Sequence, residues 1–233
     1  MKIGVITFPG SNGDMDCIHT LEQIGGCEPE LIWHKSTDLL AADALVLPGG
    51  FAHGDYLRVG AIARFSPVMR EVERFAGAGR PVLGICNGFQ VLTEAGLLPG
   101  ALLRNQHILF RCAWVHVRVE STGSPWLAGA QTGQVLKVAV AHGQGNYFAD
   151  SDSLNGLQSR SQVALRYCDA DGVVTADSNH NGSVLSIAGV TNDAGNVLGM
   201  MPHPERSSDP LLGSSDGRVM FESVVRSLIG VAS

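Results

Sequence analysis

The chain has 233 residues and a mass of 24.5 kDa, the size of one large domain or at most two small ones. Its 16 basic and 22 acidic residues give a formal net charge of −6 and form no block of like charge, which disfavours a nucleic-acid footprint and a polybasic membrane patch. Hydrophobic residues make up 45% of the chain, enough to bury a substantial core, so the composition argues against wholesale disorder.

Targeting and redox signals point to the cytoplasm. The N-terminal residues 1–5 lack the layout of a signal peptide, and no apolar run approaches the roughly 20 residues that span a bilayer. The five cysteines include no Cys-x-x-Cys pair, which argues against a disulfide framework and a zinc site. The histidines are scattered without the short spacings of zinc ligands, so we expect no metal.

Strand and helix patterns alternate over the first hundred residues. Strands are predicted over the apolar runs 2–8, 30–33, 44–47 and 82–85. Helices are predicted over 14–24 with Asp14 as N-cap, over 67–78, and through Phe89 to a stop at Gly96. This alternation predicts an α/β fold, with a mostly parallel sheet and helices on both faces.

The middle of the chain has a different pattern. Strand-like runs separated by Gly, Asn, Asp and Ser cover 112–119, 135–141, 163–167 and 184–190. We interpret them as antiparallel strands and loops inserted into the α/β core. A strand over 197–201 and a helix over 217–229 then complete the core. Since there is no linker or internal repeat, we predict a single domain over 1–233 with an inserted β-rich segment of about 105–192.

The sharpest local signal is Gly84-Ile85-Cys86-Asn87-Gly88, between a predicted strand and a predicted helix. This is the nucleophile-elbow pattern with cysteine at its centre. The flanking glycines permit a sharp turn, and the N-terminus of the following helix favours a thiolate. A buried structural cysteine in a glycine turn explains the motif equally well when it is taken alone.

A candidate base lies in Met201-Pro202-His203-Pro204-Glu205, directly after an apolar strand. In an open parallel sheet, ligands bind at the carboxyl ends of the strands. Residues before proline favour extended geometry, in which residues two apart point to the same side. We therefore expect Glu205 to hold one ring nitrogen of His203 and to direct the other toward a nucleophile. The alternative is a proline-rich loop with a solvated histidine and glutamate.

A third element, Pro48-Gly49-Gly50, follows a neighbouring strand. Acyl transfer requires backbone N–H groups directed at the position where an oxyanion forms. Asn87, the residue after Cys86, can supply one N–H group, and Gly50 can supply the other. An ordinary glycine turn is the alternative.

These motifs resemble class I glutamine amidotransferases in order and spacing, and the resemblance covers nearly the whole chain. The runs that carry it are Pro48-Gly49-Gly50-Phe51, Gly84 to Gln90, and His203-Pro204-Glu205. More narrowly, the chain resembles the glutaminase subunits of phosphoribosylformylglycinamidine synthases. This closer match is carried by the runs 9–12, 50–58, 60–65, 97–100, 181–183, 187–189 and 199–206.

The resemblance implies a flavodoxin-like core and a cysteine hydrolase mechanism. Cys86 would attack the side-chain amide of glutamine, His203 would protonate the leaving ammonia, and water would release glutamate from the thioester. Glu205 would orient His203. The backbone N–H groups of Gly50 and Asn87 would form the oxyanion hole.

The same resemblance implies glutamine contacts at Gln90, His142 and Gly145, although one position departs from the family. The family usually reads His-Gly-Glu-Gly where this chain has His142-Gly143-Gln144-Gly145. If that glutamate pairs with a base or binds the ammonium group of glutamine, the affinity for glutamine is lower here. If it only shapes the loop, nothing changes.

The resemblance also implies partners. Ammonia would pass to a large synthetase subunit that uses ATP and Mg to convert formylglycinamide ribonucleotide to the amidine, often with a small bridging subunit. The chain itself has no Gly-x-x-x-x-Gly-Lys-[Ser/Thr] loop, so we expect it to hold no cofactor. The loop from Phe51 to Arg58 is a candidate partner contact, or else merely an ordered active-site loop.

Two other function classes stay open at this point. One is a different cysteine hydrolase, such as a peptidase or deglycase. In those enzymes the base often follows the cysteine directly, whereas Asn87 follows Cys86 here. The other is a non-catalytic regulatory subunit, against which the intact Cys86, His203 and Glu205 argue.

Overall fold

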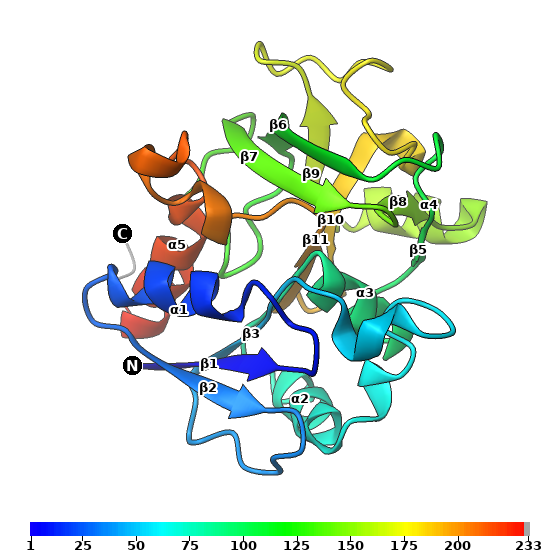
Figure 1. Ribbon diagram of the computed structural model, residues 1–233. Helices are drawn as coiled ribbons and strands as arrows, with labels where there is room; N and C mark the ends of the chain where they lie inside the picture. The colour runs from blue at the N-terminus through cyan, green and yellow to red at the C-terminus, as the bar shows by residue number, and fades with distance from the viewer. Residues whose placement is uncertain (231–233) are drawn as a thin grey trace.

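The computed structural model describes residues 1–230, and residues 231–233 of the predicted domain lie outside the described residues. Nine strands form one sheet in the order β2-β1-β3-β4-β11-β10-β9-β6-β7 (Figure 1). The strands of this sheet are β1 (Lys2–Thr7), β2 (Glu28–Trp33), β3 (Ala44–Leu47), β4 (Val82–Ile85), β6 (Arg111–Val119), β7 (Val135–His142), β9 (Val163–Cys168), β10 (Ile187–Thr191) and β11 (Val197–Met200). Two short strands, β5 (Ala101–Leu103) and β8 (Asn146–Phe148), pair separately.

The sheet has a parallel half and an antiparallel half. Strands β2, β1, β3, β4 and β11 run parallel to one another, whereas β10, β9, β6 and β7 pair antiparallel. The two halves join where β10 pairs with β11, with Gly189 opposite Met200. The α/β fold with an antiparallel insertion is confirmed, and the inserted strands extend the same sheet.

Helices cover both faces of the parallel half. In Figure 1, α1 and α5 lie on one side of the sheet and α2 and α3 on the other. The helices are α1 (Asp14–Glu22), α2 (Pro67–Gly77), α3 (Asn87–Glu94), α4 (Ser151–Ser159) and α5 (Arg218–Ile229). Within residues 1–230, no helix has both the length and the apolar character needed to cross a membrane.

Two local predictions differ from the structure, and one helix was not predicted. Asp14 is the first helical residue of α1 and not its N-cap, which is Gly13. The run 184–190 is not one strand, because a 3-10 turn with Leu185 at φ 52° precedes β10. Helix α4 was not predicted, because it buries only Leu157 and therefore has almost no apolar periodicity.

The central strands bring the motifs to one edge of the sheet. All residues of β3, β4 and β11 are buried, as expected for parallel strands covered on both faces. Since β3 pairs with β4 and β4 pairs with β11, the segments that follow these three strands are neighbours. These segments begin at Pro48, Cys86 and Met201. The fold therefore gathers the three candidate motifs at adjacent strand ends.

Candidate active site

Cys86 lies in the tight turn between β4 and α3. Its backbone has φ 50° and ψ −104°, a conformation that residues with a side chain rarely adopt. Its N–H group donates to the carbonyl oxygen of Met200 at 2.7 Å, and its Sγ lies 3.8 Å from the carbonyl oxygen of Ala141. A strained cysteine at a strand-to-helix turn is the geometry of a nucleophile elbow.

Gly88 makes this turn possible. A Cβ atom at Gly88 would lie 1.9 Å from the carbonyl oxygen of Leu47, at the end of β3. The first turn of α3 therefore packs directly against the backbone of β3. Any side chain at this position would displace the helix that carries the N-terminus to Cys86.

His203 and Glu205 form a buried pair at the end of β11. Nδ1 of His203 lies 2.6 Å from Oε1 of Glu205, and both side chains are almost completely buried. The backbone N–H of His203 donates to the carbonyl oxygen of Ala139 in β7 at 2.8 Å. Ser207 adds a hydroxyl that donates to the carbonyl oxygen of His203 at 2.9 Å. These contacts hold the backbone of His203 against β7 and Ser207, and its ring against Glu205.

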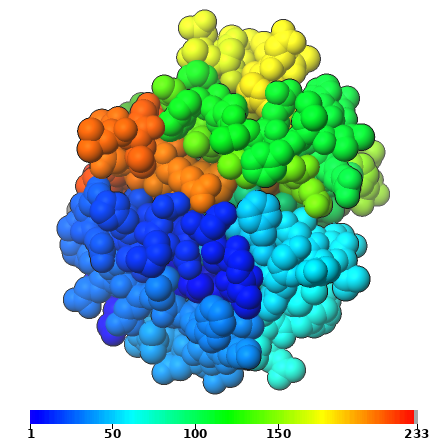
Figure 2. Space-filling view, viewed as in Figure 1, coloured from blue at the N-terminus to red at the C-terminus, as the bar shows by residue number. Residues whose placement is uncertain are grey.

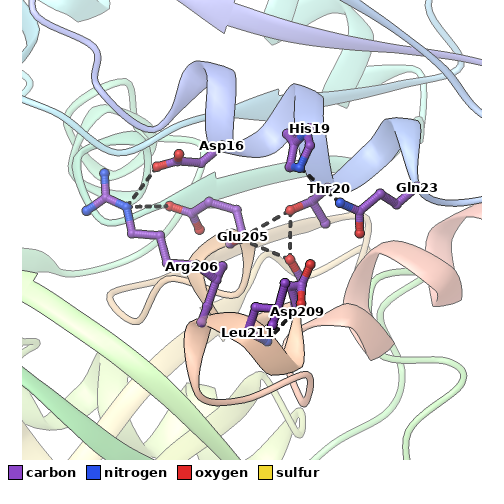
Figure 3. Close-up of a pocket in the computed structure, with 10 residues that line it drawn as sticks. Asp16, His19, Thr20, Gln23, Glu205, Arg206, Asp209 and Leu211 are labelled. Carbon is purple, nitrogen blue, oxygen red and sulfur yellow. Dashed lines mark hydrogen bonds and ion pairs between the residues drawn. The ribbon is translucent and has the colours of Figure 1, made fainter.

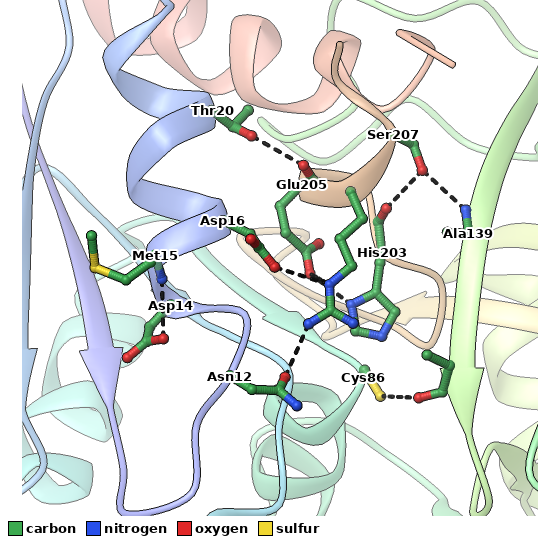
Figure 4. A network of polar contacts seen from close by, with 12 residues as sticks. Asn12, Asp14, Met15, Asp16, Thr20, Cys86, Ala139, His203, Glu205 and Ser207 are labelled. Atoms are coloured by element: carbon green, nitrogen blue, oxygen red, sulfur yellow. Dashed lines mark hydrogen bonds and ion pairs between the residues drawn. The ribbon is translucent and has the colours of Figure 1, made fainter. Parts of the chain in front are cut away.

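The imidazole lies between Glu205 and Cys86 (Figure 4). Burial alone would lower the pKa of His203, but the nearby charges of Glu205 and Cys86 outweigh burial and raise it. Within residues 1–230, Nε2 of His203 is buried without a hydrogen-bond partner. One ring nitrogen is therefore held by the carboxylate, while the other is free for a reacting group.

Gly49 allows the sulfur and the ring to approach each other. A Cβ atom at Gly49 would lie 2.6 Å from Cε1 of His203 and 3.6 Å from Cβ of Cys86. A larger residue would therefore clash with the imidazole. The sequence indicated a glycine turn here, but it gave no sign that Gly49 borders both reactive side chains.

The two N–H groups predicted for an oxyanion hole are placed beside Cys86. Gly50 has φ 151° and borders the cavities next to Cys86. Within residues 1–230 its N–H donates no hydrogen bond, whereas the next N–H, that of Phe51, donates to Gly10. Asn87 is the first residue of α3, so its N–H has no acceptor within the helix. Both groups are thus available to a ligand oxygen.

The three predicted glutamine contacts have different surroundings. Gln90 lines a cavity beside Cys86, and its Nε2 donates to the carbonyl oxygen of Gln144 at 2.6 Å. His142 lines the same cavity, but its Nδ1 donates to Oδ1 of Asn105 at 3.1 Å. Burial, followed by the charge of His203, lowers the pKa of His142 to about 4, so it is neutral at physiological pH.

Gly145 does not line this cavity. Its N–H donates to Oδ1 of Asn105 at 2.9 Å, and its carbonyl oxygen accepts from Asn181 and Ser183. A Cβ atom at Gly145 would lie 2.4 Å from the ring of His142. Gly145 therefore shapes the loop that carries His142 and Gln144.

Two small cavities lie next to Cys86. The first, of about 190 Å³, is bordered by Asp55, Gln90 and the loop from His142 to Gln144. The second, of about 180 Å³, is bordered by His203 and Arg206. Both cavities also touch Gly50, Phe51, Cys86, Phe110 and Ala141. Cys86 thus stands between a chamber on the Gln90 side and a chamber on the His203 side.

A larger cavity of about 480 Å³ lies behind Glu205 (Figure 3). It is bordered by Asp16, Thr20 and Arg206, and the hydroxyl of Thr20 donates to the backbone carbonyl oxygen of Glu205 at 3.1 Å. Cys86 is not among the residues that border it. This cavity is therefore separate from the reactive sulfur, despite its size.

Arg206 is a site residue that the sequence argument missed. Its Nε lies 3.0 Å from Oδ2 of Asp16 and 3.8 Å from Oε1 of Glu205, and its NH2 group donates to Oδ1 of Asn12 at 3.0 Å. Burial alone would lower the pKa of Arg206, but Glu205 and Asp16 raise it, so the guanidinium stays charged. Its position next to Glu205 in the sequence was the one available signal.

Comparison with known proteins gives a consistent picture. Residues 1–220 match the family described as CobB/CobQ-like glutamine amidotransferase domain. The chain is 55% identical over 231 residues to Phosphoribosylformylglycinamidine synthase subunit PurQ of Chlorobium chlorochromatii (strain CaD3), covering 99% of both chains. It is 53% identical to the protein of the same name from Thermomicrobium roseum, covering 97% of this chain and 95% of that protein.

Two solved structures resemble this chain in fold. A chain in the structure of PurLQS from Thermotoga maritima is 40% identical, with a TM-score of 0.86, over 97% of this chain and 98% of that one. A glutamine amidotransferase from Thermotoga maritima has a TM-score of 0.61 at 14% identity, over 99% of this chain and 98% of that one. The second likeness concerns the fold alone.

Proposed function

The chain belongs to the family of CobB/CobQ-like glutamine amidotransferases. From its similarity to subunits of phosphoribosylformylglycinamidine synthases, we propose that it is the glutaminase subunit of such a synthase. It hydrolyses glutamine to glutamate and ammonia, and a synthetase partner uses the ammonia to make formylglycinamidine ribonucleotide in purine biosynthesis. The observation that supports this most strongly is the buried alignment of Glu205, His203 and Cys86 at the edge where β4 and β11 end.

In the proposed reaction, the Cys86 thiol gives its proton to His203, and the sulfur attacks the side-chain carbonyl carbon of glutamine. The carbon–nitrogen bond breaks as the imidazolium of His203 gives its proton to the leaving ammonia. A water molecule then attacks the thioester, with His203 as the base, and glutamate leaves. Glu205 fixes the ring orientation through the 2.6 Å contact at Nδ1 and stabilises the protonated ring.

The charge that develops on the substrate oxygen is assigned to the N–H groups of Gly50 and Asn87. Neither group is engaged by another acceptor, and both lie beside Cys86. Removing one such donor from an acyl-transfer site costs roughly 10²–10³ in kcat. Gln90 borders the same cavity and contributes a polar wall for glutamine.

The cavity on the Gln90 side is assigned to glutamine. Its volume of about 190 Å³ lies below the roughly 300 Å³ at which sites for drug-sized ligands begin, which fits a substrate as small as one amino acid.

The rim of the site is the proposed contact for the synthetase. Phe51 and Phe110 border both cavities beside Cys86 and are exposed. Apolar side chains close to them in the chain are exposed too: Tyr56 and Leu57 after Phe51, and Ile108 and Leu109 before Phe110. An exposed apolar patch around a reaction site marks a protein interface, and covering it would keep ammonia from escaping to solvent.

The complex needs components that this chain does not supply. We infer that ATP and Mg bind the synthetase rather than this chain, and that a small bridging subunit completes the complex. A cytoplasmic location likewise stays a prediction from the sequence.

The test compares glutamine and ammonia as nitrogen donors in the complex with the synthetase. We expect Cys86→Ala to abolish glutamine-dependent synthesis and to leave synthesis from ammonium chloride intact, because only the first needs the sulfur. We also expect the isolated chain to release glutamate slowly and the complex with its nucleotide ligands to release it faster.

Three outcomes would contradict the proposal. If the Cys86→Ala variant still releases glutamate, Cys86 is not the nucleophile. Strong cleavage of peptides by the isolated chain favours the peptidase alternative. An absence of glutamate release in the wild-type complex favours a non-catalytic subunit.

A further inference from the structure

Asp55 borders the cavity assigned to glutamine, and within residues 1–230 its side chain makes no hydrogen bond or ion pair. Among the described residues that line this cavity, it is the single carboxylate. Its Oδ1 is buried and has no hydrogen-bond partner within residues 1–230. Arg58, three residues after Asp55 in the same loop, pairs with Glu94 instead.

The backbone holds Asp55 in a strained but anchored loop. It ends the 3-10 turn Ala52–Asp55 with φ 56°, a left-handed value that aspartate tolerates at a cost. The N–H of Ala52 donates to the side chain of Asn87 at 3.1 Å, and that of His53 donates to the carbonyl oxygen of Pro9 at 2.7 Å. These bonds tie the turn to the elbow helix and to the loop after β1.

The carboxyl group of Asp55 has a raised pKa. Burial raises the pKa of Asp55 to about 6, and no charged neighbour opposes the shift. A buried acceptor without a donor costs free energy, and a donor that enters the cavity would remove this cost. A cationic group entering the cavity would satisfy the oxygen and favour the ionised form.

We propose that Asp55 binds the α-ammonium group of the substrate glutamine, and this inference rests on the proposed glutaminase function. Glutamine carries its ammonium group at the end of the molecule opposite the amide that meets Cys86. The neighbouring Gln144 side chain is neutral and cannot supply the charge. Asp55 therefore selects an α-amino acid over a simple carboxamide.

The experiment measures steady-state glutaminase kinetics in the complex with the synthetase. We expect Asp55→Asn to raise KM for glutamine about tenfold or more, because a charge-assisted hydrogen bond is lost, with kcat changing by about threefold at most. Asp152→Asn, at an exposed position in α4, is the matched control and leaves both constants unchanged.

A second substrate isolates the ammonium group. Glutaric acid monoamide has the same reacting amide and carboxylate as glutamine but lacks the amino group. The wild-type complex should prefer glutamine, and Asp55→Asn should shrink that preference about tenfold or more, because only glutamine loses a contact.

The pH profile of the wild-type complex gives a readout that needs no variant. KM for glutamine should rise as pH falls below about 6, because the Asp55 carboxylate is then protonated, and this rise should be absent in Asp55→Asn. The other titratable groups nearby are His53 in the same loop, Cys86 at the start of α3, and His142 at the end of β7. The pKa of His142 is about 4, so it titrates below this range.

The outcomes distinguish a failure of the role of Asp55 from a failure of the proposed glutaminase function. An unchanged KM in Asp55→Asn, or a collapse of kcat at constant KM, would overturn the role of Asp55 as an ammonium ligand. An equal loss for glutamine and the monoamide would do the same. If the wild-type complex releases no glutamate at all, the proposed function itself fails.

Discussion

At the scale of single residues, the behaviour of His203 depends on its two neighbours. Glu205 lies 2.6 Å from one ring nitrogen, and the pKa of His203 is raised because the charges around it outweigh burial. The imidazolium therefore persists to a higher pH than that of a free histidine, whose pKa is about 6.5. In the proposed reaction, this proton is the one that goes to the leaving ammonia.

This arrangement predicts an order of losses in the glutaminase assay. His203→Ala should lower kcat by about 10²–10⁴-fold, because it removes proton transfer. Glu205→Gln should cost less, because it weakens orientation and charge stabilisation only. It should also lower the pKa of His203, so the alkaline limb of the pH–rate profile should move to lower pH.

Glu222→Gln, in α5, is the matched control and should change neither the rate nor the profile. Equal losses in Glu205→Gln and His203→Ala, or an alkaline limb that does not move, would count against the assigned roles.

Which site residues could be predicted depended on whether the signal was local. Cys86 stands in a five-residue elbow, and the spacing of His203 and Glu205 follows from extended backbone, so both motifs can be read in the sequence. The contact of Arg206 with Asp16 spans nearly the whole chain. A contact that only the folded state creates leaves no pattern around either residue.

At the scale of elements, the elbow depends on close packing of α3 against β3. Gly88→Ala should lower the free energy of unfolding by about 2 kcal/mol or more, because its Cβ would meet the Leu47 carbonyl oxygen at 1.9 Å, too close for a side chain to adjust. Urea denaturation of the purified chain measures this change.

Gly77→Ala is the matched control, since a Cβ atom at the last residue of α2 would meet nothing within 4 Å. It should raise the free energy of unfolding by up to about 1 kcal/mol, through helix propensity. Equal stability of the two variants would mean that α3 is not packed against β3 as described.

The elements themselves were predictable to different degrees. The predicted bounds of β3 and β4 are confirmed, because buried parallel strands are short apolar runs between glycine and proline signals. Helix α4 buries a single side chain, so its pattern was invisible even though Asp150 caps it. Apolar periodicity reports burial, and a helix that buries little leaves little trace.

At the scale of the whole molecule, the site is closed by the two halves of the sheet together. The parallel half supplies the segments after β3, β4 and β11, while Ala141 and His142 at the end of β7 form the opposite wall. In Figure 2, the yellow and green middle part of the chain lies above the blue and cyan N-terminal part, and the orange segment lies between green and blue on the left.

That wall could not be placed from the sequence. The position of β7 is set by the succession of β11, β10, β9 and β6, and these pairings join segments far apart in the chain. The sequence predicted that the inserted strands are antiparallel. It did not predict that they continue the same sheet by pairing with β11. The single domain over 1–233 stays a prediction.

Labelling with a glutamine-like chloroketone tests the central claim most directly, because it identifies the sulfur that meets the substrate. The complex with the synthetase is treated with this reagent, digested and mapped by mass spectrometry. We expect modification of Cys86, with loss of glutamine-dependent synthesis and full retention of ammonia-dependent synthesis. Cys112, an exposed thiol outside the elbow, should stay unmodified. Glutamine-dependent synthesis that continues after complete labelling of Cys86 would contradict the account.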